Sequence, residues 1–382
     1  MVRFSRGLGS GRRMARAWAA PRTFKERGYM QTSETTLKPG GPRSAGSIPQ
    51  RRVPQAWPKD RRFRILSLDG GGIRGVFPAS VLAELERRFC AGHRVSEYFD
   101  LIAGTSTGGI IALGLGGGCS ADEMKTLYVE RGHEIFPPRK RSRLYSAASF
   151  LRQTVLYRYD RDAIARLLSE TLGEKLFGES VSRLCVPAFD GTHSEVFVYK
   201  TPHHADYKFD RFEKMINIGL ATSAAPTFFQ PFKSGGYQLV DGGVWANNPI
   251  MLAVIEALTC FDVTPTQIDV LSIGCGDDPY FVSSSQIKFG GMWFWKDAIF
   301  AAMRLQSLAA TNQARLLLGP PSVVRLSPPI YSPSIELDDW RRAVDQLPGD
   351  ALSATEANAV RIKKMFFEGV ADTFVPVPAT AT

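Results

Sequence analysis

The stretch Gly104-Thr105-Ser106-Thr107-Gly108 decides the fold of this chain; it lies between an apolar run at 98–103 and a run of small and apolar residues at 109–113. The first run is short enough for a buried strand and the second can begin a helix, so the pentapeptide predicts a sharp strand-to-helix turn. A serine at such a turn has a strained backbone and an exposed hydroxyl. Gly104 and Gly108 fit where a side chain would clash or the backbone takes a positive φ. Taken alone, the pattern also fits an ordinary tight turn.

Two further glycine-bearing turns follow predicted strands. Asp69-Gly70-Gly71-Gly72-Ile73-Arg74-Gly75 follows the strand-like 63–68, and Asp241-Gly242-Gly243 follows the apolar 237–240. In open α/β sheets the ligand binds at the carboxyl ends of the strands. Three segments that are distant in sequence are therefore expected to converge on one crevice.

The glycine run has competing interpretations. Residues 70–75 match G-x-G-x-x-G, the dinucleotide-binding fingerprint, and 68–72 resembles the phosphate loop of sugar kinases. A nucleotide-using kinase or reductase would account for neither Ser106 nor Asp241. A hydrolase accounts for both, since consecutive glycine amides can hold an oxyanion and Arg74 adds positive charge for a phosphate-bearing substrate.

No histidine is a good candidate for the base that activates Ser106. The usual hydrolase order is Ser, then Asp, then His, and no histidine follows Asp241. Asp190 with His203 or His204 has the right order, but both histidines lie in a polar stretch that predicts a surface turn. The histidines of the chain are His93, His133, His193, His203 and His204.

The simpler hypothesis is a dyad in which Asp241 accepts the proton of Ser106 directly. A carboxylate is a poor base for a hydroxyl unless both are held within hydrogen-bond reach, and partial desolvation raises its pKa toward useful values. Gly242 and Gly243 let the backbone of this turn approach the serine turn closely.

In this order, from residue 69 to residue 243, the three motifs resemble the signature of the patatin-like phospholipases: D-G-G-G-x-R/K-G, then G-x-S-x-G, then D-G-G/A. The resemblance implies an α/β fold, a three-layer αβα sandwich with a central, mostly parallel sheet. It implies a phospholipase A type carboxylic ester hydrolase that cleaves fatty acyl esters of membrane glycerophospholipids without a metal or cofactor. It makes Ser106 the nucleophile and Asp241 the proton acceptor. The implied oxyanion hole is Gly70, Gly71 and Gly72, and the supporting residues are Arg74, Gly75, Gly104, Gly108, Gly242 and Gly243.

The stretches 102–114, 200–204, 221–227 and 240–249 are similar to bacterial patatins of cyclic-oligonucleotide antiphage signalling. That resemblance implies a cyclic dinucleotide activator such as cGAMP, a cytoplasmic protein acting at the inner face of the cell membrane, and a homo-oligomer. No residue pattern marks a nucleotide pocket. The alternatives are a patatin-type lipase or esterase without nucleotide control, and a non-catalytic lipid- or nucleotide-binding protein of the same fold.

Composition divides the 382 residues into a tail and a domain. Residues 1–60 hold 13 Lys or Arg and three acids, which accounts for the whole net charge of +10 and leaves residues 61–382 neutral. A nucleic-acid polymer is therefore not an expected partner. We expect 1–60 to be a disordered basic tail and 61–382 to be the catalytic domain. An organelle transit peptide, a start at Met14 or Met30, and attraction to anionic membranes are other interpretations of the tail.

Other residue types narrow the function classes further. No run of 18 apolar residues lacks polar breaks, so no transmembrane helix is expected. Five dispersed cysteines predict reduced core thiols in a cytosolic protein, and no His, Cys or acid cluster has metal-ligand spacing. The aromatic stretch 289–300 fits a helix start packed on the sheet or an interfacial lid.

Periodicity predicts alternating elements after residue 62. The expected strands are 63–68, 98–103, 183–188, 195–199, 237–240, 268–274 and 322–326. The expected helices are 73–89, 107–115, 121–131, 160–172, 214–223, 248–260, 293–314 and 353–368. This alternation predicts a sheet with helices on both faces.

Overall fold

The computed structural model describes residues 52–137, 157–276 and 298–378. Most of the expected tail, and residues 289–297 of the aromatic stretch, lie outside these ranges. Residues 52–60 are described and pack on the sheet domain. Gln55 N donates to Cys260 O at 2.8 Å, and the buried ring of Trp57 packs against the rings of Phe63 and Phe261.

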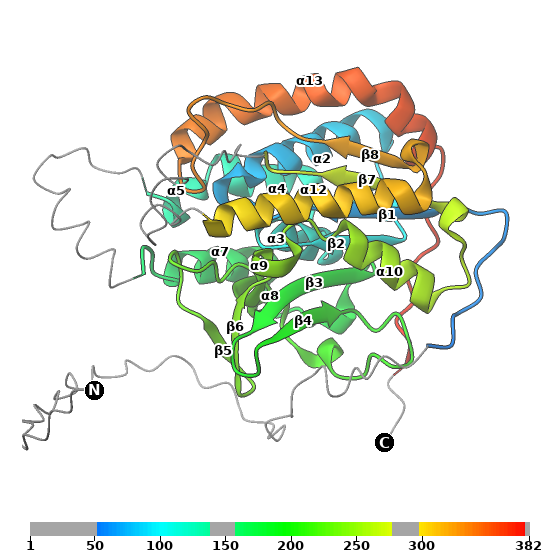
Figure 1. Cartoon of the computed structure of the whole chain (residues 1–382), viewed down its shortest axis with the longest axis horizontal. Coiled ribbons are helices and arrows are strands. Elements are labelled where there is room, and N and C mark those ends of the chain that lie inside the picture. Colours follow the sequence, from blue (N-terminus) through cyan, green and yellow to red (C-terminus); the bar gives the residue numbers. More distant parts are fainter. Residues whose placement is uncertain (1–51, 138–156, 277–297, 379–382) are drawn as a thin grey trace, which may run out of the picture. The chain divides into compact units, whose positions relative to one another are not determined.

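Within the described ranges, eight strands form one sheet in the order β5-β6-β3-β2-β1-β7-β8, with β4 paired to β3 (Figure 1). The strands are β1 (Phe63–Leu68), β2 (Leu101–Gly104), β3 (Leu184–Asp190), β4 (Glu195–Lys200), β5 (Phe232–Ser234), β6 (Tyr237–Asp241), β7 (Ile268–Ile273) and β8 (Val323–Leu326). Strands β3, β2, β1, β7 and β8 run parallel, whereas β4 and β6 are antiparallel to β3. The sheet is therefore mostly parallel, with an antiparallel margin at β4, β5 and β6.

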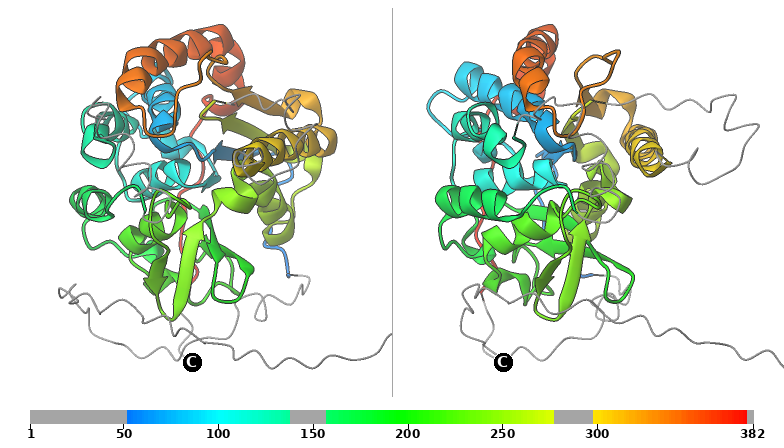
Figure 2. Two further views of the ribbon diagram at one scale, coloured as in Figure 1. Left: turned by 60° about the vertical axis from the view of Figure 1, so that its left-hand side comes forward. Right: turned by 90° about the vertical axis from the view of Figure 1, so that its left-hand side faces the viewer.

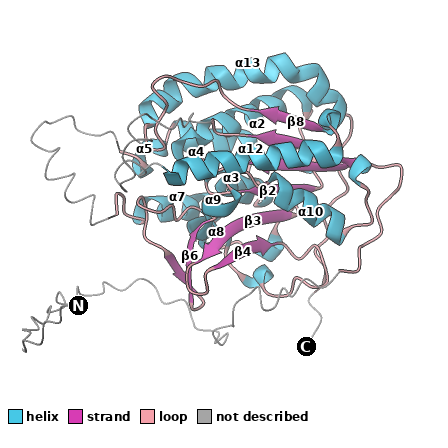
Figure 3. Cartoon of the chain, in the orientation of Figure 1, coloured by secondary structure: helices cyan, strands magenta, loops and turns pink. Residues whose placement is uncertain are grey.

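Helices cover both faces of the sheet (Figures 2 and 3). The main ones are α2 (Val76–Phe89), α3 (Thr107–Gly116), α4 (Ala121–Val129), α7 (Asp162–Leu172), α8 (Met215–Thr222), α10 (Ile250–Cys260), α12 (Ala298–Leu318) and α13 (Trp340–Phe366). Short helices are α5 (Gly132–Ile135) and α9 (Gly243–Ala246). These layers confirm the predicted three-layer α/β sandwich.

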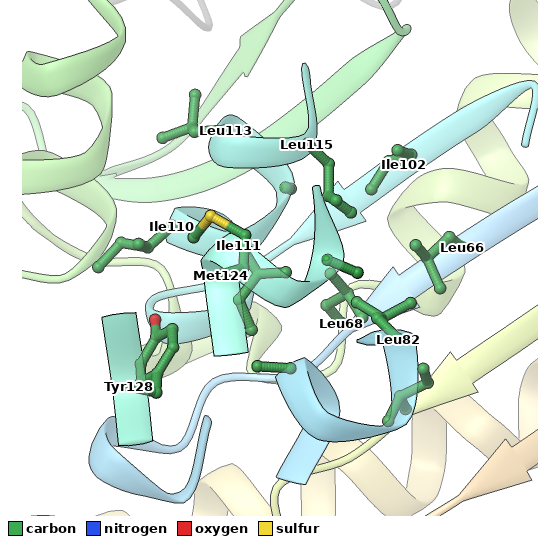
Figure 4. Close-up of a cluster of buried hydrophobic side chains, with 14 of the residues drawn as sticks. Leu66, Leu68, Leu82, Ile102, Ile110, Ile111, Leu113, Leu115, Met124 and Tyr128 are labelled. Carbon is green, nitrogen blue, oxygen red and sulfur yellow. The ribbon is translucent and has the colours of Figure 1, made fainter. Parts of the chain in front are cut away.

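The sheet has one hydrophobic core on each face, because successive side chains of a strand point to opposite faces. Leu66 and Leu68 of β1 point into the core shared with α2, α3 and α4 (Figure 4). Phe63 and Ile65 of the same strand point into the core shared with α10 and α12. Because both faces of β1 are buried, its sequence is a nearly continuous apolar run, as parallel strands require.

Most predicted elements are confirmed within a few residues, but the last helix was predicted too short. Helix α13 runs from Trp340 to Phe366 and includes Pro348, whereas the predicted helix began only at residue 353. Ala343, Leu347 and Ala351 are buried on both sides of the proline, so tertiary packing outweighs the lost backbone hydrogen bond. The sequence also did not predict β5, α5 or α9.

Candidate active site

The three glycine-bearing turns meet at one site. Ser106 follows β2, the glycine loop 70–72 follows β1, and Asp241 ends β6. Strand β6 is antiparallel to β3, so it brings Asp241 to the site from the direction opposite to β1 and β2. All three turns lie at the carboxyl ends of their strands, as predicted, although β6 is antiparallel to the neighbouring β3.

Ser106 occupies the strained turn that its sequence predicts. Its backbone has φ 53° and ψ −120°, a region that L-residues rarely adopt, and it caps the N-terminus of α3. Its amide donates to Thr222 Oγ1 at 3.0 Å, and Thr222 Oγ1 donates to Pro187 O at 2.6 Å. This chain of hydrogen bonds holds the turn against the middle of β3.

The side chains of Ser106 and Asp241 are in direct contact. Ser106 Oγ donates to Asp241 Oδ2 at 2.6 Å, and the amide of Gly243 donates to Asp241 Oδ1 at 2.7 Å. Burial raises the pKa of Asp241 to about 6, and the two hydrogen bonds only partly oppose this rise. The serine hydroxyl is thus paired with a base whose pKa lies near neutral pH.

None of the five histidines, all of which the structure describes, lines the cavity that holds Ser106. The predicted surface turn at His203 and His204 is wrong, because both side chains are buried. His203 Nε2 lies 3.1 Å from Glu256 Oε1, and Asp190 pairs with His193 at 2.6 Å. The hypothetical Asp190–His203 and Asp190–His204 couples are therefore not formed.

The glycine loop supplies two amides to the site, not three. Gly70 N donates to Asn247 O at 2.9 Å, so it is not available for an oxyanion. This corrects the expected role of Gly70, which joins the loop to the turn after Asp241. In the ranges that the structure covers, Gly71 N and Gly72 N donate to no protein acceptor. Gly72 has φ +56°, and a Cβ there would lie 2.4 Å from Leu337 O.

A buried ion pair holds the glycine loop in place. Arg325 of β8 reaches Asp69 with both Nη atoms, at 2.8 and 2.5 Å, and also donates to Ser272 of β7 at 2.7 Å. The loop is thereby tied to β7, which pairs with β1, and to β8, which lies beyond β7. Bidentate pairing of this kind fixes geometry as well as charge.

The remaining predicted residues let the three turns approach each other. A Cβ at Gly108 would lie 2.3 Å from Leu68 O, and one at Gly242 would lie 2.4 Å from Pro187 O. Equally close contacts exist at Gly75 and Gly104, whereas Gly243 contributes its amide to Asp241. Arg74 lines the cavity beside the glycine loop.

Ser106 opens into a cavity of about 120 Å³ with two unlike walls. One wall is apolar and belongs to the core of α3, α4 and α7; it includes Ile110, Leu127, Phe136, Leu167, Phe228 and Phe229. The other wall includes Asn247 from the turn after α9 and Met303 and Arg304 from α12.

Sequence reasoning assigned no role to Asn247 or Arg304. Asn247 follows the Asp-Gly-Gly turn by a few residues, so its place in the motif could have indicated it. Its Oδ1 atom is buried and meets no donor among the described residues. Arg304 lies in an ordinary helical pattern, and no local signal marks it.

The fold also brings together Cys185, His203 and Glu256, whose ligand atoms lie within 4.8 Å of one another. The chemistry of this set fits a hydrogen-bond network better than a metal site. Lys200 Nζ contacts Glu256 at 2.6 Å, and together with His203 it keeps the pKa of Glu256 low despite burial. Burial raises the pKa of the Cys185 thiol, so it is a poor metal ligand.

Comparison with known proteins identifies relatives of this chain. A family model described as "Patatin-like phospholipase" matches residues 66–254. A "cGAMP-activated phospholipase" from Escherichia coli (strain TW11681) is 36% identical over 59% of this chain and 66% of the relative. One from Vibrio cholerae serotype O1 is 36% identical over 61% of this chain and 70% of the relative. One from Pseudomonas aeruginosa (strain BWHPSA011 / Pa011) is 31% identical, over 67% and 76%.

Proposed function

The chain belongs to the patatin-like phospholipase family, and we propose that it hydrolyses fatty acyl esters of membrane glycerophospholipids with a Ser106–Asp241 dyad. The observation that carries this proposal is the 2.6 Å contact between Ser106 Oγ and Asp241 Oδ2 inside the two-walled cavity. A nucleophile and base must be within hydrogen-bond reach before the pKa of either matters.

The first half-reaction forms an acyl-enzyme. Ser106 Oγ attacks the ester carbonyl carbon while its proton passes to Asp241 Oδ2. The carbonyl oxygen becomes an oxyanion and accepts hydrogen bonds from the amides of Gly71 and Gly72; loss of one such donor typically costs about 10²–10³ in rate. Collapse of the tetrahedral intermediate breaks the bond to the leaving oxygen, which takes the proton from Asp241 and departs as a lysophospholipid.

The second half-reaction is hydrolysis. Water attacks the acyl carbon and gives a proton to Asp241, the same two amides stabilise the second oxyanion, and Ser106 Oγ recovers that proton as the fatty acid leaves. The apolar wall accommodates the acyl chain during both steps. A long chain suits this wall because burial of each methylene contributes about 0.8 kcal/mol.

We further propose that a cyclic dinucleotide activates the enzyme, because the three bacterial relatives named above have that activation in their names. A homo-oligomer on activation belongs to the same proposal. The alternative is a lipase without nucleotide control. Both accounts use the Ser106–Asp241 contact, so an assay with and without nucleotide separates them.

We assign catalysis to residues 61–382 and propose action at the inner face of the cell membrane. No helix in the ranges given above is long and apolar enough to span a bilayer. Helix α12, which lines the cavity with Arg304, carries outward-facing leucines, among them Leu305 at 61% and Leu316 at 87% exposure. We propose that this face meets the lipid surface, since its exposed leucines are on the helix that also lines the cavity.

A fatty-acid release assay on phospholipid vesicles, with and without a panel of cyclic dinucleotides, tests the function. We expect release that depends on the nucleotide and disappears in Ser106→Ala. A fluorophosphonate probe should label the wild type but not Ser106→Ala. Ser353→Ala, at an exposed position on α13, is the control and should keep both signals. Wild-type release from Ser106→Ala would refute the proposal, and full activity without nucleotide would support the unregulated lipase.

A further inference from the structure

Arg304 of α12 contributes a guanidinium group to the wall of the catalytic cavity. Its Nε atom is buried, and no acceptor among the residues described here meets it. The same side chain lines the cavity that contains Ser106. A buried N–H group without an acceptor is destabilising unless a ligand or solvent supplies one.

The position of Arg304 relative to Ser106 is set by hydrogen bonds. Asn248 N donates to Gln306 Oε1 at 2.9 Å, and Gln306 Nε2 donates to Asn248 O at 3.1 Å. Asn247 Nδ2 donates to Ser307 Oγ at 3.1 Å. This part of α12 is thus joined to the turn whose carbonyl, Asn247 O, receives the amide of Gly70. The helical turn that carries Arg304 is therefore fixed relative to the glycine loop, and both line one cavity.

Arg304 lies on the wall that does not belong to the acyl-binding core. The apolar wall is part of the cluster on the α3, α4 and α7 face of the sheet, whereas α12 packs with α10 on the other face. With the acyl chain along the apolar wall and the ester carbonyl at Ser106, the rest of a lipid must extend toward α12. In a glycerophospholipid the phosphate is only a few bonds from the ester.

We propose that Arg304 binds the phosphodiester of the glycerophospholipid whose acyl ester lies at Ser106. The guanidinium is planar, always charged and matched to phosphate oxygens. This inference rests on the proposed function and deepens it, because it makes phosphate recognition the reason that the enzyme prefers phospholipids to neutral acylglycerols. Arg74 lines the same cavity from the loop side and adds positive charge.

The test compares two arginines of one helix on two matched lipids. Arg304→Gln is compared with Arg315→Gln, since Arg315 is exposed on α12 and does not line the cavity. Each variant is assayed in detergent mixed micelles on a phosphatidylethanolamine and on a diacylglycerol with identical acyl chains, with an activating cyclic dinucleotide at saturation. A nonionic detergent gives micelles of low surface charge. General electrostatic attraction between arginines and the lipid surface then contributes little to the rates.

We expect Arg304→Gln to lower kcat/KM about tenfold or more on the phospholipid and to leave kcat/KM on the diacylglycerol unchanged. Arg304→Lys should recover part of the loss, because it keeps the charge without the planar fork. Arg315→Gln should change neither value. Labelling of Ser106 by the fluorophosphonate probe should be the same in all variants, which shows that they fold.

Three results would refute the proposal that Arg304 binds the phosphodiester of the substrate. An equal loss of kcat/KM on both lipids would show that Arg304 has a structural role. An unchanged kcat/KM on both lipids would show that Arg304 does not bind the phosphodiester. A change only in the cyclic dinucleotide concentration needed for half-maximal activity would assign Arg304 to the phosphates of the activator. Wild-type protein that cleaves neither lipid would instead refute the proposed function itself, which separates the two failures.

Discussion

Asp241 and Ser106 are 135 residues apart in sequence, and their side chains meet at 2.6 Å because β2 and β6 end toward each other along one edge of β3. Strand β4 occupies the other edge of β3 along 185–190. Strand β2 pairs with residues 184–185 of β3, and antiparallel β6 pairs with 188–190. The two strand ends therefore converge, with Asp241 in register with Ala188.

The buried carboxylate of Asp241 predicts a pH-dependent rate. Only its ionised form accepts the Ser106 proton, and burial raises its pKa to about 6. We expect kcat/KM to fall about tenfold per pH unit below pH 6 and to be flat above pH 7. A pH–rate profile from pH 4.5 to 8.5 on a soluble ester checks this. A rate independent of pH between 5 and 7 would exclude Asp241 as the base.

The same pKa predicts that Asp241→Asn stabilises the fold at neutral pH. The pKa of the Asp241 carboxyl is about 6 in the folded protein and 3.8 in the unfolded chain. Its contribution to the free energy of unfolding is therefore fully present below pH 3.8 and is lost as the pH rises through about 6. Asparagine does not carry the buried charge, so its advantage at pH 7.5 should reach about 1–3 kcal/mol and vanish near pH 3.5. Urea unfolding at both pH values measures it, and a variant less stable than wild type at pH 7.5 would contradict the argument.

The Asp69–Arg325 ion pair should be essential for the position of the glycine loop 70–72. Arg325→Met removes the bidentate partner of the buried Asp69 carboxylate, and breaking a buried ion pair in this way typically costs about 3–5 kcal/mol. We expect lower thermal stability and loss of activity. Asp69→Asn combined with Arg325→Met should recover stability but not activity, since the bidentate anchor of the loop is still missing. Recovery of activity in the double variant would show that the ion pair does not position the loop.

The exposed face of α12 should matter only when the substrate is in a membrane. Leu305→Asp is expected to reduce hydrolysis of vesicle phospholipids several-fold and to leave hydrolysis of a soluble p-nitrophenyl ester unchanged. Val360→Asp is the matched control, because Val360 is 85% exposed on α13, which packs on the opposite side of the sheet. Equal effects of the two substitutions would exclude α12 as the membrane-facing surface.

Local sequence was sufficient wherever a turn requires particular residue types. Gly104 and Gly108 around Ser106 predict the strained turn because no larger residue allows the approach of Leu68 O to position 108. The nearly continuous apolar run along 63–68 likewise predicts a buried strand with two covered faces. These features depend on neighbours a few residues away, which the sequence displays directly.

Features that depend on distant partners were predicted poorly. His203 and His204 lie in a polar stretch and yet are buried, because Glu256 on α10 and the carbonyl of Val53 supply their hydrogen bonds. Gly70 was expected in the oxyanion hole, but Asn247 O accepts its amide. Neither partner is close in the chain.

The sequence by itself determined the three glycine-bearing turns, the residue types that they present and the succession of strands and helices, because these follow from short-range sterics and side-chain periodicity. The tertiary structure alone decided the antiparallel approach of Asp241, the burial that raises its pKa, the hydrogen bond of the Gly70 amide to Asn247 O, and the place of Arg304 opposite the apolar wall. The physical reason is that hydrogen-bond partners and desolvation are set by strand register and helix packing between residues far apart in the chain.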